Sequence, residues 1–173
     1  MADAKTTLAA APARHSISLY VANKPGVLIR IALVFSRRGF NIDSLVVSET
    51  EDPGFSRMNI VAKGDRATLA QILKQLNKLV DVIHARDYSY EDVIQKELAL
   101  FKIDCPTERR TEAIQVMEAF RAKTIDLTET TMAIEATGSS EKLDALETML
   151  ASFHIREMVR TGKVLMARGE AAT

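Results

Sequence analysis

The stretch NKPGVLIRIALVF, residues 23–35, offers backbone groups for chemistry rather than reactive side chains. Pro25 and Gly26 stand at the head of an apolar run with helical spacing. The first N–H groups of a helix lack a partner within the helix, and a glycine lets a ligand approach them without a Cβ in the way. This pattern predicts a site for a small anion, such as the carboxylate of a free amino acid whose side chain meets an apolar wall. A tight helix start without any ligand explains the same residues, so spacing alone leaves both interpretations open.

The side chains that usually carry catalysis are isolated along the chain. His15, His84 and His154 have no partner at metal-ligand spacing, and Cys105 has no neighbouring His or Cys. The phosphate-binding loop GxxxxGK[ST], the dinucleotide motif GxGxxG and the nucleophile motif GxSxG do not occur in the sequence. We therefore expect no catalytic residue and no metal site. The rival class, a stand-alone enzyme, would turn over a substrate without any partner.

Composition narrows the class of protein further. The 173 residues are 47% hydrophobic, which is enough for one large or two small packed domains. Because 23 basic residues balance 23 acidic ones, no net charge attracts the chain to nucleic acid or to anionic membranes. A single cysteine excludes an intramolecular disulfide, and no apolar run approaches the roughly 18 residues of a membrane span. We expect a cytoplasmic protein without nucleic-acid or membrane partners.

The first half of the chain alternates strand and helix patterns. Residues 1–14 read as a disordered tail, and HSISLYVA, residues 15–22, alternates like a half-buried strand. Asp52-Pro53-Gly54 predicts a turn between two strands, and Asp65 is a plausible N-cap. The expected elements are a strand at 15–22, a helix at 25–38 ended by Gly39, strands at 41–49 and 56–64, a helix through residue 79 and a strand at 81–88. Their order is βαββαβ.

The second half repeats this order. An offset of 74 residues pairs Leu69 with Leu143 and Leu76 with Leu150, which indicates an internal repeat, although any two amphipathic helices can be aligned in this way. Thr107 is the expected cap of the first helix, and residues 89–97 are expected to form a short linking helix. The remaining strands are expected at 98–105, 124–129, 130–137 and 155–162. The predicted organisation is an α+β fold with one domain at 15–90 and a second at 91–173.

Two four-stranded antiparallel sheets with helices on one face leave the other face uncovered. Strands such as SLVVSE and MNIVAK carry more apolar residues than a water-facing sheet needs, so we expect self-association. Sheets of this topology also bind single-stranded RNA through aromatic residues on their strands. The strand at 56–64 has no aromatic residue and the chain has no Trp, so RNA binding is disfavoured.

Several motifs together resemble the regulatory, or small, subunit of acetolactate synthase, also called acetohydroxyacid synthase. They are NKPGVL at 23–28, RRGFNIDSL at 37–45, SRM at 56–58, KQLNKLVDV at 74–82 and TGSSEKLDA at 137–145, within a resemblance that runs from about His15 to Gly169. The resemblance implies two ferredoxin-like domains, the N-terminal one an ACT domain. It also implies a subunit without catalysis of its own that activates the large catalytic subunit. A branched-chain amino acid, usually valine, would inhibit the enzyme through it. Thiamine diphosphate, FAD and Mg²⁺ would bind only to the large subunit. The alternative is a stand-alone ACT-type amino-acid sensor of another metabolic enzyme.

The same resemblance implies an effector site between two ACT domains paired side by side in a homodimer. One protomer would contribute Asn23, Gly26, Val27 and Leu28, and the other would contribute Asn41 and Ile42. In the second half of the chain, Thr107 stands near the position of Gly26 and Thr124 at that of Asn41. We therefore expect one sensing domain and one that lacks both binding elements.

Overall fold

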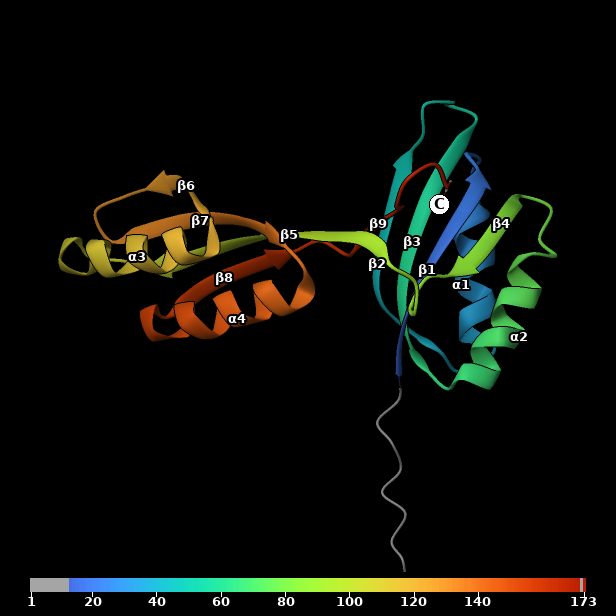
Figure 1. Ribbon diagram of the computed structural model, residues 1–173, viewed down its shortest axis with the longest axis horizontal. Helices are drawn as coiled ribbons and strands as arrows, with labels where there is room; N and C mark the ends of the chain where they lie inside the picture. Colours follow the sequence, from blue (N-terminus) through green and yellow to red (C-terminus); the bar gives the residue numbers. More distant parts are fainter. Residues whose placement is uncertain (1–12, 172) are drawn as a thin grey trace, which may run out of the picture.

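The computed structural model describes residues 13–171 and residue 173, and it contains two βαββαβ domains (Figure 1). In the N-terminal domain, both helices lie on one face of an antiparallel sheet with strand order β2-β3-β1-β4. Its elements are β1 (Ala13–Ala22), α1 (Val27–Ser36), β2 (Asn41–Glu49), β3 (Phe55–Gly64), α2 (Arg66–Leu76) and β4 (Val82–Asp87). The predicted order of elements is confirmed. Residues 1–12 of the predicted tail lie outside the described residues, and residues 13 and 14 begin β1.

The end of α1 and the start of α2 have the local determinants that the sequence predicts. Gly39 takes the left-handed conformation (φ 69°) just after α1, which allows Phe40 N to donate to Phe35 O at 3.1 Å. The Asp65 carboxylate caps α2 by accepting from Thr68 N at 2.8 Å. The end of α1 and the start of α2 are therefore each determined by one local residue.

The prediction that β1 is half-buried is wrong, because both of its faces are covered. Leu19 on the helix side and Ser18 on the opposite side are each 0% exposed. The C-terminal segment of the chain lies on that opposite face (Figure 1), where His84 Nε2 hydrogen-bonds to Thr173 O at 3.2 Å. A Cβ added to Gly162 would lie 2.8 Å from a methyl group of Val46. The chain itself thus covers much of a face that was expected to need a partner.

The C-terminal domain has the same topology, with strand order β6-β7-β5-β8. Ala62 in β3 and Ala136 in β7 are both buried, and so are Leu69 in α2 and Leu143 in α4, so the 74-residue repeat is structural. The elements are β5 (Val93–Asp104), the 3₁₀ turn η1 (Thr107–Arg109), α3 (Arg110–Phe120), β6 (Lys123–Leu127), β7 (Thr131–Gly138), α4 (Ser140–Leu150), the 3₁₀ turn η2 (Ala151–Phe153) and β8 (Ile155–Arg160). A further strand, β9 (Val164–Ala167), was not predicted.

Two predictions at the start of this domain are wrong. Residues 89–97 form no linking helix, since β5 begins at Val93 and pairs with β9 over its first four residues. Thr107 is not a cap, because it opens the 3₁₀ turn η1, and α3 then begins after Arg109 without a side-chain cap. The unexpected strand therefore replaces a linker with a two-stranded ribbon.

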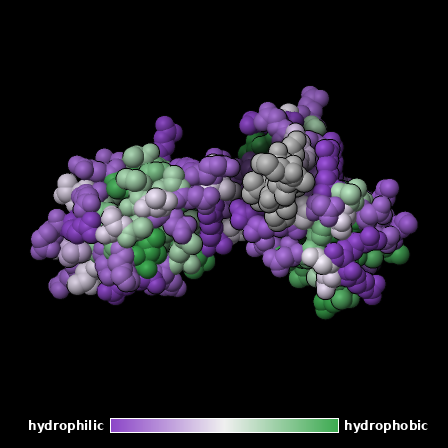
Figure 2. Space-filling model, turned by 90° about the horizontal axis from the view of Figure 1, so that it is seen from below, coloured by the Kyte–Doolittle hydropathy of each residue, from purple (hydrophilic) through white to green (hydrophobic). Residues whose placement is uncertain are grey.

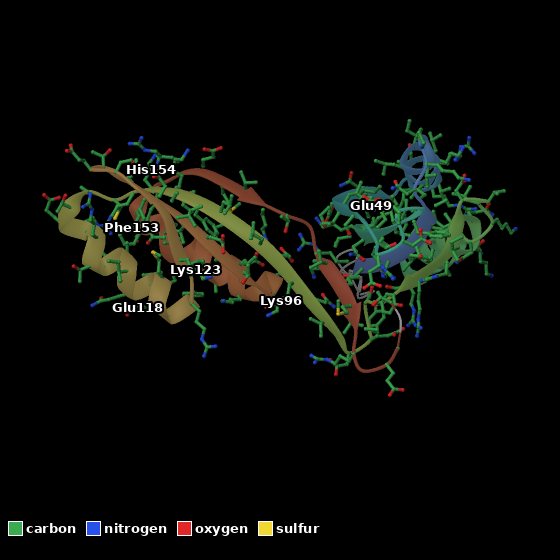
Figure 3. All side chains as sticks on the ribbon, turned by 90° about the horizontal axis from the view of Figure 1, so that it is seen from above. Glu49, Lys96, Glu118, Lys123, Phe153 and His154 are labelled. Carbon is green, nitrogen blue, oxygen red and sulfur yellow. The ribbon has the colours of Figure 1, made fainter. Side chains whose placement is uncertain are left out.

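The two domains are joined where this ribbon enters the C-terminal sheet. Lys96, at this junction in Figure 3, is followed by Glu97, which is 7% exposed and accepts from Arg160 Nε at 2.6 Å. Phe153 and His154 lie at the far end of the C-terminal domain. The connection is thus a hydrogen-bonded element with a partly buried ion pair.

Candidate functional site

The start of α1 is an open set of backbone donors. Gly26 is left-handed (φ 85°), provides no side-chain cap, and would place an added Cβ more than 4 Å from every residue other than its chain neighbours. Arg30 N donates to Gly26 O at 3.1 Å, the first full turn of the helix. Within the part of the chain that the structure describes, the N–H groups of Gly26, Leu28 and Ile29 have no protein acceptor. Together with the positive end of the helix dipole, these groups can bind an anion.

The other predicted residues at this end have different surroundings. The Asn23 amide donates to Pro53 O at 3.0 Å and so ties the start of α1 to the β2–β3 turn. Val27 is only 4% exposed, because its side chain belongs to the core, whereas Leu28 is 44% exposed. The Val27 N–H donates to Lys24 O at 3.4 Å, so neither the backbone donor nor the side chain of Val27 is open to a ligand here. Leu28 is the apolar side chain available to it.

Asn41 and Ile42 lie at the opposite end of α1. They border a hollow of about 450 Å³ between the last turns of the helix and the beginning of β2. Its lining residues are Ala32, Phe35, Ser36, Gly39, Phe40, Asn41 and Ile42. Asn41 is exposed and Ile42 is half-buried, so the hollow combines one exposed amide with an apolar wall.

The predicted residues therefore form two groups rather than one site within a chain. α1 has ten residues, and at a rise of about 1.5 Å per residue its ends are about 15 Å apart. A small ligand does not bridge that distance. Two α1 helices packed antiparallel about a two-fold axis would place the start of one beside the end of the other.

The surface around these two groups is apolar. Five large side chains of α1 and of the edge strand β2 are exposed, and Figure 2 shows hydrophobic surface on this domain. They are Leu28, Ile29, Leu33, Leu45 and Val47, which we call the α1–β2 edge. Because β2 is the last strand of its sheet, one side of its backbone is also unpaired. A surface with both properties is typical of an interface between protein chains.

Asp43, which the sequence analysis missed, organises the charges beside Asn41. Its carboxylate accepts from Asn41 Nδ2 at 3.1 Å and lies 3.0 Å from Lys63 Nζ and 3.5 Å from Arg14 Nε. Burial acts to raise the pKa of Asp43. The hydrogen bonds from Lys63 and Asn41, and the charges of Lys63 and Arg14, more than offset that effect and hold the pKa below its usual range. An acidic residue two positions after Asn41 on the same strand was the available signal.

Comparison with known proteins decides the family. Residues 17–84 match the family described as the AHAS small subunit-like ACT domain, and residues 96–169 match the small subunit of acetolactate synthase. The chain belongs to the acetolactate synthase small-subunit family. The resemblance predicted from the motifs is thereby confirmed, as is an N-terminal ACT domain. All six predicted effector residues lie within the matched ACT region.

Individual members of the acetolactate synthase small-subunit family are similar to this chain over nearly its whole length. A probable acetolactate synthase small subunit of Methanothermobacter thermautotrophicus is 46% identical over 159 residues, 91% of this chain and 95% of that protein. A small subunit of Mycobacterium bovis is 44% identical, over 91% and 94% of the two chains. The crystal structure of the acetolactate synthase small subunit from Thermotoga maritima is 40% identical, with a TM-score of 0.82 over 92% of this chain and 99% of that one.

One further observation concerns membranes. None of the helices between residues 13 and 171 is both long enough and apolar enough to span a bilayer.

Proposed function

We propose that this chain is the non-catalytic regulatory subunit of a cytoplasmic acetolactate synthase. In this proposal it activates the large catalytic subunit and confers feedback inhibition by a branched-chain amino acid, with valine as the first candidate. The observation that carries the proposal is the open start of α1 at Gly26, within an ACT domain of the small-subunit family. Thiamine diphosphate, FAD and Mg²⁺ are assigned to the large subunit.

The effector binds between two ACT domains in this proposal. Its carboxylate meets the free N–H groups of Gly26 and Leu28 of one protomer, while Asn41 and Ile42 of the other protomer complete the site. Charge-assisted hydrogen bonds contribute about 1.5–3 kcal/mol each, and burial of a small aliphatic side chain contributes about as much. After the cost of association, this corresponds to affinities in the micromolar to millimolar range, which suit the sensing of a metabolite pool.

The α1–β2 edge is the proposed interface of the homodimer. Its exposed apolar side chains and unpaired β2 backbone support side-by-side pairing of the two sheets. Because each site would contain groups from both protomers, effector binding depends on how the dimer is arranged. A coupling free energy of about 1–3 kcal/mol would shift the favoured arrangement by roughly 5- to 150-fold.

Calorimetric titration of the purified chain with valine, leucine and isoleucine tests this function, alongside assays of the large subunit with and without the chain. We expect saturable binding of at least one of the three, higher activity of the large subunit in the presence of the chain, and inhibition by the same amino acid. If no branched-chain amino acid binds and the large subunit does not respond, the proposal is wrong. Binding without any effect on the large subunit would favour the sensor of another enzyme.

A further inference from the structure

The orientation of the Asn41 amide is determined by its neighbour Asp43. Asn41 Nδ2 lies 3.1 Å from Asp43 Oδ1. An ionised carboxylate only accepts hydrogen bonds, so the NH₂ side of the amide must face Asp43. The amide oxygen then points away from Asp43, and within residues 13–171 it has no hydrogen-bond partner. Asn41 is exposed at the hollow beside α1, so this oxygen is available to a ligand.

Asp43 is itself held in place and kept ionised by two cations. Lys63 on the neighbouring strand β3 lies 3.0 Å away and Arg14 on β1 lies 3.5 Å away, while the Asp43 side chain is only 18% exposed. Removal of its charge would leave both cations without this partner. The carboxylate is therefore a fixed acceptor for the Asn41 NH₂ group at neutral pH.

The backbone also holds this pair of side chains together. The pairing of β2 with β3 shifts between Ile42 and Ser44, so Asp43 occupies a β-bulge. Just before the pair, the Phe40 ring is 8% exposed and packs on Gly64, where an added Cβ would lie 2.0 Å from the ring. The strand start is thus fixed before any ligand arrives.

We propose that Asp43 is a positioning residue that presents the Asn41 oxygen to the effector and so selects ligands that carry an ammonium group. This inference rests on the proposed function. The Asn41 oxygen can accept a hydrogen bond from the –NH₃⁺ group of an amino acid. In the corresponding 2-oxo acid a carbonyl oxygen takes the place of that group, and two acceptors then face each other. The site therefore recognises an amino acid and rejects the 2-oxo acid with the same side chain.

The test compares valine with 3-methyl-2-oxobutanoate, its 2-oxo analogue, by calorimetric titration of the full-length subunit. For the unchanged protein we expect valine to bind about 100-fold more tightly, because a site built to hydrogen-bond an NH group rejects an analogue that lacks it. In Asp43→Asn the residue at position 43 can both donate and accept, so the Asn41 amide is free to turn. Valine affinity should fall about tenfold while that of the oxo acid changes less than about threefold.

Asp81→Asn is the matched control. Asp81 is 19% exposed and pairs with Arg30 on the same domain, so this variant also removes one partly covered carboxylate from an ion pair. It should leave the ratio of valine to oxo-acid affinity unchanged. If Asp43→Asn fails to fold, as judged by thermal unfolding without ligand, Asp43→Ser removes the fixed acceptor with a smaller side chain.

The outcomes separate the two proposals. An unchanged affinity ratio in a folded Asp43 variant overturns the positioning role of Asp43 but leaves the proposed function standing. Equal affinity of the unchanged protein for valine and its oxo acid also overturns this inference alone. Failure of the unchanged protein to bind any branched-chain amino acid overturns the proposed function and this inference together.

Discussion

The two domains share one topology but treat the start of their first helix in opposite ways. α1 begins at Gly26 with free N–H groups and no side chain nearby. At the equivalent place before α3, the Arg109 guanidinium donates to Ser152 O at 2.8 Å and to Glu112 at 3.0 Å, and it lies 4.1 Å from the Phe153 ring centre. The 3₁₀ turn η1 also leads directly into α3, so that Arg109 N donates to Pro106 O and Arg110 N donates to Thr107 O. On a common scaffold, a helix start without such backbone partners distinguishes the candidate binding domain.

The second strands of the two domains, β2 and β6, also differ at the position of the proposed site. Both carry a bulge, at Asp43 in β2 and at Ile125 in β6. By position relative to the bulge, Lys123, rather than Thr124, corresponds to Asn41. A flexible cation thus replaces an amide held by a carboxylate, so the C-terminal domain lacks both halves of the proposed site.

The largest expected effect comes from closing the open helix start. Gly26→Asp places a carboxylate where the effector carboxylate is proposed to bind, so valine binding should fall by more than about 100-fold through like-charge repulsion and steric overlap. Titration calorimetry measures this change. Gly26→Ala is the control, because any side chain at φ 85° carries a conformational cost of roughly 1–2 kcal/mol without the charge. Equal losses in the two variants would mean that strain, not anion binding, explains the result.

The proposed interface can be broken with a matched pair of helix substitutions. Leu33 of α1 is 45% exposed and Ile114 of α3 is 44% exposed, so each is an exposed apolar side chain on the first helix of its domain. Leu33→Asp should weaken dimerisation about 30-fold, because it buries a charge in the α1–β2 edge, and should weaken valine binding with it. Ile114→Asp should change neither. Analytical ultracentrifugation over a concentration series would refute the interface if both variants dimerised like the unchanged protein.

Asn41→Ala removes the amide without altering the core. We expect about a tenfold rise in the valine concentration needed for inhibition, since one hydrogen bond to a charged group is lost, with activation of the large subunit unchanged. Lys123→Ala, the corresponding change in the C-terminal domain, should leave inhibition as it was. Inhibition curves of the reconstituted enzyme give both values, and a response to Lys123→Ala equal to that of Asn41→Ala would contradict the distinction between the domains.

Arg109→Ala should affect stability rather than binding. It uncovers the Phe153 ring and removes the bond to Ser152 O, so we expect a loss of about 1 kcal/mol in the free energy of unfolding. Denaturant unfolding measures this loss. Valine affinity should stay the same, and a change in affinity would mean that the closed helix start of the C-terminal domain takes part in sensing.

The smallest expected difference concerns the second helix of each domain. The hydrogen bond from Thr68 lowers the pKa of Asp65, the cap of α2, whereas α4 is capped by Ser139, which does not titrate. Because the folded-state pKa is lowered, this stabilisation is present above the unfolded pKa and is lost as the pH falls through the folded value, below about pH 4. The unfolding temperature should fall slightly less between pH 5 and pH 3 in Asp65→Asn than in the unchanged protein. No difference would mean that the cap is not coupled to unfolding.

Sequence reasoning succeeded where the determinants are local. Gly39, the Asp52 turn and the Asp65 cap each act within a few residues, and the apolar spacing of Leu69 and Leu143 reveals the repeat. The open start of α1 was predictable for the same reason, because it depends on Pro25 and Gly26 alone.

The missed features depend on contacts between distant parts of the chain. β9 is a strand of four residues, and its partner in β5 lies about 70 residues earlier in the chain. No local sequence pattern therefore predicts it. Without β9, the strand conformation at Val93 has no explanation. Asp43 was missed because its role depends on Lys63 and Arg14 from two other strands.

The continuity of β5 limits how the two halves of this protein can move. From Val93 to Ile103 it pairs first with β9 and then with β8, and Thr161 N donates to Leu98 O where the return chain passes between them. Two hydrogen-bonded strands resist stretching and swivelling far more than a single flexible peptide would. A change of twist in one domain is therefore transmitted to the other as torsion about the axis of the ribbon, because the ribbon itself deforms little.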